Sequence, residues 1–261
     1  MNDNDFSMNL SDKTALITGA GSGIGRAIAG KFASQGAQVI LHDVTPDTKK
    51  IAASLGGLFI AADLADPAAV RQLGAAALQA AGNRIDILVN NAGFQYVAPI
   101  QEFPEEVWMR MVQVLLIAPF QLIRALLPGM KERHWGRIIN VSSIHGLVAS
   151  PSKSAYVSAK HGLVGLTKTV ALEAGAFGVT VNAICPAYVR TPLVEKQIGE
   201  QARLNAIKEE EVIDKIMLGP AAIKRLIDPE EVADFALYLA SEHARSITGA
   251  AHLLDLGWTA R

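Results

Sequence analysis

The sequence predicts an α/β fold in which a single doubly wound parallel sheet carries helices on both faces. Short, nearly continuous apolar runs alternate with longer helical segments from residue 13 to about residue 185. Such runs are typical of strands buried on both faces, and this alternation is typical of a parallel sheet. The chain has no internal repeat, low-complexity tract or Pro/Gly/Ser-rich linker, so we expect one domain over residues 1–261.

Some segments have the apolar character of buried strands, and longer segments between them have the pattern of helices. The predicted strands are Thr14–Thr18, Gln38–His42, Leu58–Ala61, Ile85–Asn90, Gly136–Ser142, Val179–Ile184 and Ala251–Leu254. The predicted helices include Gly25–Gln35, Pro67–Ala81, Glu105–Arg133 and Ser154–Phe177. Residues 191–224 are rich in Glu, Lys and Ile and show no strand signal, so we expect an inserted helical lid after the sixth strand.

Composition excludes several classes of protein. Half of the residues are hydrophobic and the net charge is −1, so the chain can bury a sizeable core and lacks the basic surplus of a nucleic-acid-binding domain. The single cysteine, Cys185, rules out an internal disulfide framework and is typical of a reducing compartment. The most apolar stretch, Val112–Leu127, is interrupted by polar residues and a proline, which favours a buried helix over a membrane span. We therefore expect a cytoplasmic protein without nucleic-acid or membrane partners.

A glycine-rich turn follows the first predicted strand and opens the next helix. In the run Thr18-Gly-Ala-Gly-Ser-Gly-Ile-Gly25, glycines let the backbone approach a pyrophosphate, and the helix N-terminus supplies N–H donors. Asp43 ends the second strand, where a carboxylate accepts hydrogen bonds from ribose hydroxyls and repels a 2′-phosphate. The alternatives are a tight structural turn and a helix-capping aspartate. We predict an NAD site, with NAD preferred over NADP, that includes Gly19, Ser22, Gly23, Ile24, Gly25 and Asp43.

Tyr156 and Lys160 are four residues apart in a predicted helix and therefore share one face. A phenol has a reference pKa of about 10, so it is a poor base at neutral pH. A positive charge about 4 Å away, at an effective dielectric of about 20, contributes roughly 4 kcal/mol, which is enough to lower that pKa to about 7. The pair is a candidate proton acceptor for alcohol oxidation, although the same spacing also occurs by chance on ordinary helices.

The glycine-rich turn, Asn90-Asn91-Ala92-Gly93, Ser143 and Tyr156-x-x-x-Lys160, in this order, resemble the short-chain dehydrogenase/reductase family from about residue 9 onward. The resemblance implies a Rossmann-type fold, a homotetramer, and catalysis by Ser143, Tyr156 and Lys160, the lysine also binding the nicotinamide ribose. It further implies that Asp63 and Leu64 flank the adenine and that Thr191 contacts the carboxamide. The remaining cofactor contacts that it implies come from Asn90, Ala92, Gly93 and Pro186.

The residues around the predicted substrate resemble a narrower group within that family, the D-3-hydroxybutyrate dehydrogenases. The resemblance rests on residues 94–99, 145–150, 153–156, 191–198 and 257–260, and it implies that a substrate carboxylate is held by Gln95, His145, Lys153 and Gln197. It extends to Trp258 and to Tyr188, which stands where the group has tryptophan. An ammonium, two amides and an imidazole do offer many donors to a small anion, although each alone could also be a surface residue, and His145 could satisfy a backbone carbonyl. We therefore expect NAD-dependent oxidation of D-3-hydroxybutyrate to acetoacetate.

Three positions depart from the family pattern. Leu115 stands where the family has an asparagine that links the lysine to solvent, so we expect the usual proton exit to be missing or rerouted. Ala187 replaces a glycine, which costs about 1 kcal/mol if φ is positive there, and Leu256 replaces another glycine near the C-terminus. Two alternatives therefore stay open: a dehydrogenase or reductase for another small hydroxy acid or a 3-oxoacyl substrate, and an NAD-binding scaffold with impaired catalysis.

Overall fold

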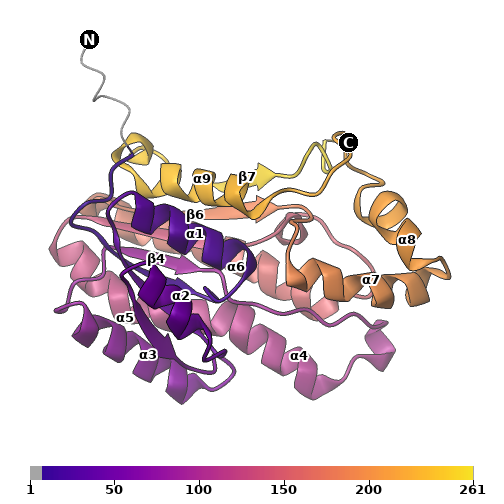
Figure 1. The fold of residues 1–261 in the computed structure, drawn as a ribbon, viewed down its shortest axis with the longest axis horizontal. Coiled ribbons are helices and arrows are strands. Elements are labelled where there is room, and N and C mark those ends of the chain that lie inside the picture. The colour runs from indigo at the N-terminus through magenta and orange to yellow at the C-terminus, as the bar shows by residue number, and fades with distance from the viewer. Residues whose placement is uncertain (1–7, 261) are drawn as a thin grey trace, which may run out of the picture.

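The computed structural model describes residues 8–260, which build one seven-stranded sheet between two layers of helices (Figure 1). All strand pairs are parallel, and the strand order is β3-β2-β1-β4-β5-β6-β7. The strands are β1 (Thr14–Thr18), β2 (Gln38–Asp43), β3 (Leu58–Ala61), β4 (Ile87–Asn90), β5 (Gly136–Val141), β6 (Val179–Pro186) and β7 (Ala251–Leu254). The predicted doubly wound parallel sheet is confirmed, and every strand overlaps its predicted range.

The described α-helices include two, α2 and α9, that the apolar pattern does not predict. For α9 a signal is present in the sequence, because Asp228 precedes Pro229 and Glu231 follows. Glu231 Oε1 accepts a 2.9 Å hydrogen bond from the Asp228 N–H, as expected at a helix start. The helices are α1 (Gly23–Ser34), α2 (Thr48–Ser54), α3 (Pro67–Ala80), α4 (Glu105–Val112), α5 (Ala118–Glu132), α6 (Ser154–Ala174), α7 (Pro192–Asn205), α8 (Glu209–Val212) and α9 (Pro229–Ala240).

The two faces of the sheet pack against different helices because successive side chains of a strand point to opposite sides. In β1, Ala15 and Ile17 face a core shared with α1, α2 and α9. Leu16 points the other way, into a core shared with α3, α5 and α6. All three side chains are buried, which explains why the strands are continuous apolar runs rather than alternating ones.

The predicted helix Glu105–Arg133 is interrupted at its centre by a π-helical turn, Gln113–Ile117, which joins α4 to α5. Such turns insert one extra residue into a helix and are frequent at functional sites. Among residues 8–260, Glu105–Glu132 is the one stretch with the length and composition to cross a membrane, but half of its apolar window is buried inside this fold. Its buried side chains belong to the cores around α3 and α6, so here it packs as a core helix.

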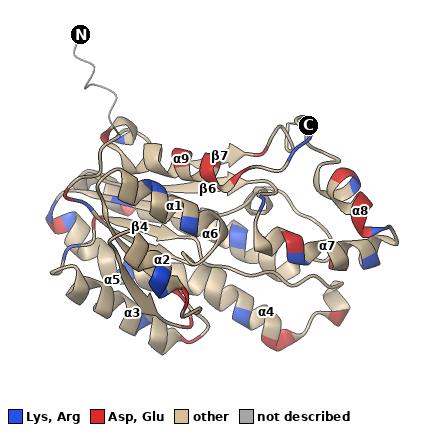
Figure 2. Ribbon diagram, in the orientation of Figure 1, with Lys and Arg blue, Asp and Glu red and all other residues tan. Residues whose placement is uncertain are grey.

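The segment between β6 and α9 is helical, as the prediction for residues 191–224 expects. It contains α7, α8 and a π-helical turn, Ile213–Met217, and lies beyond the carboxyl ends of β6 and β7 (Figure 1). Val194, Ala202, Val212 and Met217 form a small apolar core of their own within it. Lys and Arg residues alternate along its ribbon with Asp and Glu residues (Figure 2).

The strand order reverses at β1, because β2 and β3 continue to one side of it and β4 to β7 to the other. In open parallel sheets, ligands bind beyond the carboxyl ends of the strands at such a reversal. The loops that follow β1, β4, β5 and β6 meet at this end of the sheet, so residues far apart in the sequence become neighbours there.

Candidate active site

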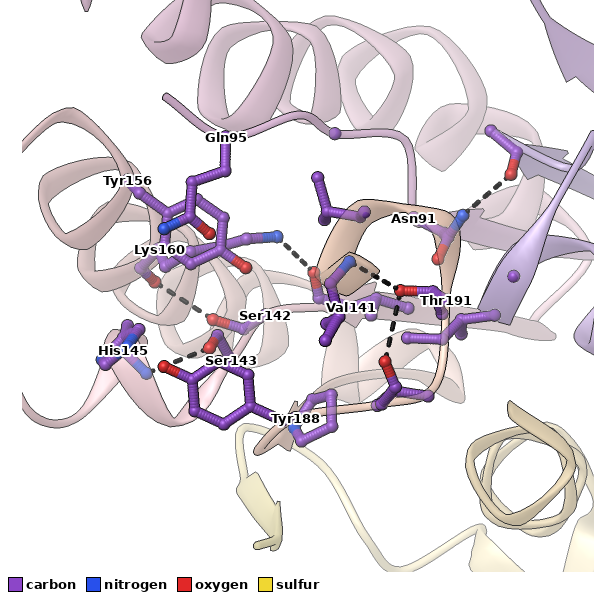
Figure 3. A pocket seen from close by; sticks show the side chains of 18 of the residues that line it. Asn91, Gln95, Val141, Ser142, Ser143, His145, Tyr156, Lys160, Tyr188 and Thr191 are labelled. Atoms are coloured by element: carbon purple, nitrogen blue, oxygen red, sulfur yellow. Dashed lines mark hydrogen bonds between the residues drawn. The ribbon is translucent and has the colours of Figure 1, made fainter. Parts of the chain in front are cut away.

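A cavity of about 300 Å³ opens at the carboxyl ends of β1, β4, β5 and β6 (Figure 3). The predicted site residues that line it are Gly19, Ser22, Gly23, Ile24, Asp43, Ala92, Gly93, Gln95, Ser143, His145, Lys153, Tyr156, Lys160, Pro186, Tyr188, Thr191 and Gln197. The lining also contains Asn91, which is not among the predicted contacts, and two of the departures from the family pattern, Leu115 and Ala187. The fold therefore gathers most of the predicted site into one cavity.

The glycine-rich turn has a backbone conformation and close neighbours that favour glycine. Gly19 and Gly23 have φ of +64° and +51°, and a Cβ on Gly19 would lie 2.7 Å from the Ala92 Cα. A Cβ on Gly23 would lie 2.9 Å from the Thr191 side chain, which lines the same cavity. Ser22 makes no side-chain capping bond at the start of α1, so N–H groups of its first turn are left for a ligand.

Asp43 ends β2 and presents its carboxylate to the cavity. Its oxygens accept 2.9 Å hydrogen bonds from the backbone N–H groups of Gly21 and Thr45, which tie the glycine-rich turn to the end of β2. A carboxylate held in this place suits ribose hydroxyls and opposes a phosphate. Together with the free helix N-terminus, these residues fit a dinucleotide cofactor.

Asn91, rather than Asn90, connects the loop after β4 to the glycine-rich turn. Its side-chain amide donates to the carbonyl oxygens of Thr18 and Gly19 at 2.9 and 3.1 Å, and its backbone N–H donates to the Thr18 hydroxyl at 3.0 Å. Asn90 instead donates to the Asn140 side chain at 2.8 Å, within the sheet. Two adjacent asparagines look alike in sequence, and only the direction of each side chain at the strand end separates their roles.

Ser143, Tyr156 and Lys160 converge on the middle of the cavity, from the end of β5 and from one face of α6 (Figure 3). Burial raises the pKa of Tyr156 to about 12, and a hydrogen bond with Ser143 opposes this rise. Burial also lowers the pKa of Lys160 to about 8. Its ammonium donates to the Val141 carbonyl at 2.6 Å and lies 5.6 Å from the centroid of the Tyr156 ring.

The expected fall in the phenol pKa is therefore not seen in the chain by itself. The i, i+4 spacing does place the two side chains on one face of α6, as predicted. Desolvation of the phenol is the largest cause of its raised pKa and outweighs the hydrogen bond with Ser143, while the Lys160 ammonium is bonded to the Val141 carbonyl instead. The pair has the predicted placement, but its electrostatic balance holds the hydroxyl protonated.

Lys153 brings a buried positive charge to the other end of the cavity. It is only 2% exposed, and its Nζ lies 3.4 Å from His145 Nε2 and 3.2 Å from the Tyr188 hydroxyl. No carboxylate within residues 8–260 forms an ion pair with it. Burial lowers the pKa of Lys153 to about 8, and burial with the neighbouring ammonium lowers that of His145 to about 3. Lys153 is thus the cation of this end, and His145 is neutral.

The two glutamines of the predicted cluster present opposite groups to the cavity. The Nε2 donor of Gln95 is buried without an acceptor, which fits a carboxylate ligand. Gln197 donates its own Nε2 to the Leu193 carbonyl at 3.1 Å, so its Oε1 is left buried without a donor. An acceptor oxygen cannot hold a carboxylate, so this side-chain orientation does not supply the donor expected of Gln197.

Five predicted residues do not line the cavity, and their contacts stay predictions. Each has another structural partner. Gly25 packs against Gly19 and Asn91, and Asp63 lies 3.9 Å from Arg110. The Leu64 carbonyl accepts a hydrogen bond from Gln113, Asn90 donates one to Asn140, and Trp258 packs edge-on against His145 at 6.2 Å between ring centroids. The Trp258 Nε1 is buried without an acceptor, so its hydrogen-bonding capacity is unused within the described residues.

The departures from the family pattern have distinct structural consequences. Leu115 is 1% exposed, lies on the π-helical turn, and packs so closely that a Cβ on Gly93 would be 2.7 Å from its Cδ2. Ala187 is not among the residues with positive φ, so the backbone strain considered for it does not arise. Leu256 does have a positive φ of 57°. Leu115 is therefore the departure that lies beside the predicted catalytic residues, since Tyr156 packs against the same apolar cluster.

Comparisons with known proteins identify related dehydrogenases. Residues 19–259 match the family model described as Enoyl-(Acyl carrier protein) reductase. The D-beta-hydroxybutyrate dehydrogenase of Rhizobium meliloti is 51% identical over 257 residues, which cover 95% of this chain and 99% of that protein. The enzyme of the same name from Cupriavidus necator is 44% identical over 258 residues, covering 97% and 100%.

A solved structure with 34% sequence identity has the same fold. It is a protein from Beutenbergia cavernae assigned as an NAD(P) dependent gluconate 5-dehydrogenase, with NADP bound at low occupancy. The TM-score is 0.86, and the match covers 98% of this chain and 100% of the other. Similar sequences thus carry different substrate names, so the substrate depends on the cavity's own residues.

Proposed function

The chain belongs to the short-chain dehydrogenase/reductase family, and from this premise we propose that it catalyses the reversible NAD-dependent oxidation of D-3-hydroxybutyrate to acetoacetate. The observation that carries the proposal is the Lys153 ammonium, which is buried beside the catalytic cluster and has no carboxylate partner among the described residues. A buried charge is costly unless an opposite charge accompanies it. A small carboxylate substrate would provide that charge, and relatives at 44–51% identity carry this activity in their names.

The proposed chemistry moves one hydride and one proton. Bound NAD would supply the acceptor for the hydride that leaves C3 of the substrate as the C–H bond breaks. Tyr156 takes the proton of the C3 hydroxyl, so that oxygen becomes the carbonyl of acetoacetate. Ser143 lies beside Tyr156 at the end of β5, where its hydroxyl donates to the same oxygen and stabilises its developing charge.

Tyr156 has to lose its proton before it can act as the base. Burial favours the neutral phenol in the chain alone, so the proposal requires added positive charge near the phenolate in the complex. Lys160 is the chain's own source of that charge, one helical turn away on the same face of α6. Movement of its Nζ from the Val141 carbonyl toward the phenol and the nicotinamide ribose would lower the pKa of Tyr156.

The carboxylate end orients the substrate for this transfer. Lys153 supplies charge, Gln95 supplies a free amide donor, and His145 lies edge-on to Tyr156 at 6.2 Å between ring centroids. Holding the acid group at this end fixes C3 between the catalytic cluster and the cofactor. We further propose that residues 191–224 close over the cavity, because Thr191, Val194 and Gln197 already line it.

The proposed cofactor preference is NAD over NADP, with Asp43 as its cause. The Asp43 carboxylate lines the cavity, where it would accept hydrogen bonds from ribose hydroxyls and repel a 2′-phosphate. A homotetramer is the proposed assembly, supported by exposed apolar residues on the α4–α5 stretch, namely Met109, Ile117 and Phe120. A cytoplasmic location agrees with the single buried cysteine.

The decisive experiment measures NADH formation with D-3-hydroxybutyrate, with the L enantiomer, and with NADP in place of NAD. We expect turnover only when the D enantiomer is combined with NAD, and none with the L enantiomer or with NADP. Turnover of other hydroxy acids but not of this one would identify a different dehydrogenase of the same family. NAD binding by calorimetry without turnover of any hydroxy acid or 3-oxoacyl substrate would favour the non-catalytic scaffold.

A further inference from the structure

Tyr188 and Lys153 form a hydrogen-bonded pair at the substrate end of the cavity. The Lys153 Nζ lies 3.2 Å from the Tyr188 hydroxyl and 5.3 Å from the centroid of its ring. In Figure 3 the Tyr188 ring lies beside Ser143 with its hydroxyl toward His145. Burial raises the pKa of Tyr188 to about 12, so the phenol stays protonated and neutral. The Lys153 charge is therefore held by neutral partners.

The donor and acceptor roles in this pair follow from the chemistry of an ammonium. Lysine has N–H donors and no acceptor, so the Tyr188 oxygen must accept the hydrogen bond from Lys153. The hydroxyl hydrogen of Tyr188 then has no hydrogen-bond acceptor within residues 8–260. Because Tyr188 lines the cavity, this hydrogen is available to a ligand there.

The backbone and ring of Tyr188 are both held in place. Its carbonyl accepts a 3.0 Å hydrogen bond from the Ile227 N–H, next to the parallel bridge between Val189 and Ile227. Its ring packs against the small apolar core of α7 and α8. The same residue therefore contacts the backbone of Ile227, the helical segment over the cavity, and Lys153.

We propose that Tyr188 is the positioning residue for the Lys153 ammonium and that its own hydroxyl donates a hydrogen bond to the substrate carboxylate. This inference rests on the proposed function, in which that carboxylate binds beside Lys153. Phenylalanine can neither accept nor donate, and the indole of tryptophan donates but cannot accept. Tyrosine is the aromatic side chain of this size that can do both at once.

Binding of butyrate tests the inference without depending on turnover, because butyrate has the carboxylate but no hydroxyl to oxidise. Calorimetry with the full chain saturated with NADH should show Tyr188→Phe binding butyrate about tenfold to a hundredfold more weakly than the unchanged protein. With D-3-hydroxybutyrate, the same variant should show a raised KM and a smaller change in kcat. Tyr238→Phe, on α9 and outside the cavity lining, is the matched control and should bind butyrate normally.

A double-mutant cycle separates positioning from general packing. In a Lys153→Met background, Tyr188→Phe should weaken butyrate binding much less than it does alone, because the two residues act together. Tyr188→Trp retains the ring and one donor but no acceptor, so it should also weaken binding, and it carries the test if Tyr188→Phe does not fold. Melting temperature and NADH affinity should stay unchanged in each variant used.

The pH dependence of butyrate binding gives a second readout. The titratable groups that the structure places against Lys153 are His145, from the turn after β5, and Tyr188, from the segment after β6. In Tyr188→Phe the desolvated Lys153 ammonium has one hydrogen-bond acceptor fewer, so the pKa of Lys153 should fall. Butyrate binding should then weaken at a lower pH than in the unchanged protein. If Tyr188 had only a structural role, the pH at which butyrate binding weakens would stay the same.

The outcomes separate this inference from the proposed function. If the unchanged protein neither binds butyrate nor oxidises D-3-hydroxybutyrate, both are overturned. If it does both and the Tyr188 variants bind butyrate as tightly as it does, or if their effect is fully additive with Lys153→Met, only the role of Tyr188 is overturned.

Discussion

Tyr156 and Lys160 lie one turn apart on α6, with the Lys160 Nζ 5.6 Å from the centroid of the Tyr156 ring and 2.6 Å from the Val141 carbonyl. The ammonium is thus bonded to the end of β5, while burial keeps the phenol in its neutral form. Helical spacing brings the two groups together, but their protonation states depend on everything packed around them.

Tyr156→Phe removes the proposed base while leaving the ring in place. Loss of general base catalysis should lower kcat for D-3-hydroxybutyrate by about 10²–10⁴-fold, with NADH affinity little changed. Steady-state kinetics and calorimetry check the two quantities. Retention of more than about half of kcat would assign proton transfer to another group.

Binding of a carboxylate ligand should weaken as the pH rises. Burial lowers the pKa of Lys153 to about 8, so the ammonium is fully present well below that value and is lost as the pH rises through it. Butyrate affinity of the NADH-loaded protein should fall by up to about tenfold per pH unit above this point. In Lys153→Met the affinity should be low and nearly independent of pH, while Lys168→Met, an exposed lysine on α6, should behave as the unchanged protein. An unchanged pH profile in Lys153→Met would remove Lys153 from the carboxylate site.

Leu115→Asn tests whether the apolar wall beside Lys160 limits proton release. The side chain is 1% exposed, so an amide there should lower the melting temperature by several degrees. If proton exit is restricted, kcat should nevertheless rise severalfold. Leu115→Ala creates space without a hydrogen-bonding group and should not increase kcat; an equal rise in both variants would point to space rather than proton transfer.

Asp43→Asn removes the charge at the end of β2 but retains a side chain of the same size. Repulsion of a 2′-phosphate should decrease, so the ratio of kcat/KM for NAD to that for NADP should fall by about tenfold. Asp47→Asn, an exposed neighbour paired with Lys50, should leave this ratio unchanged. A preference that survives Asp43→Asn would have to come from the shape of the turn.

Ala206→Gly should stabilise the protein. Ala206 follows α7 with φ of 52°, a left-handed conformation that glycine adopts without strain, and its side chain is exposed. We expect about 0.5–1 kcal/mol of added stability, seen as a small rise in melting temperature. Ala187→Gly should instead lower it, because Ala187 is not in that conformation. Equal responses would show that backbone strain at Ala206 is absent.

Much of the fold and of the site could be predicted from local pattern. Runs such as Thr14–Thr18 are apolar because both faces of a parallel strand are buried, and Gly19 and Gly23 are glycines because a positive φ and close backbone contacts require them. These properties belong to short segments, so they are visible without knowing which segments meet. The order of the motifs then indicated the family and the composition of the site.

Tertiary structure determined the hydrogen-bond partners and the protonation states of the site residues. It placed Asn91 rather than Asn90 on the glycine-rich turn, left Gln197 with a free acceptor, and bonded Lys160 to Val141. It also set the protonation of Tyr156 and Lys153, since desolvation is a sum over neighbours contributed by several distant segments. Residue type and spacing determine which groups are available, whereas side-chain direction and burial, which set their chemistry, arise only when the chain has folded.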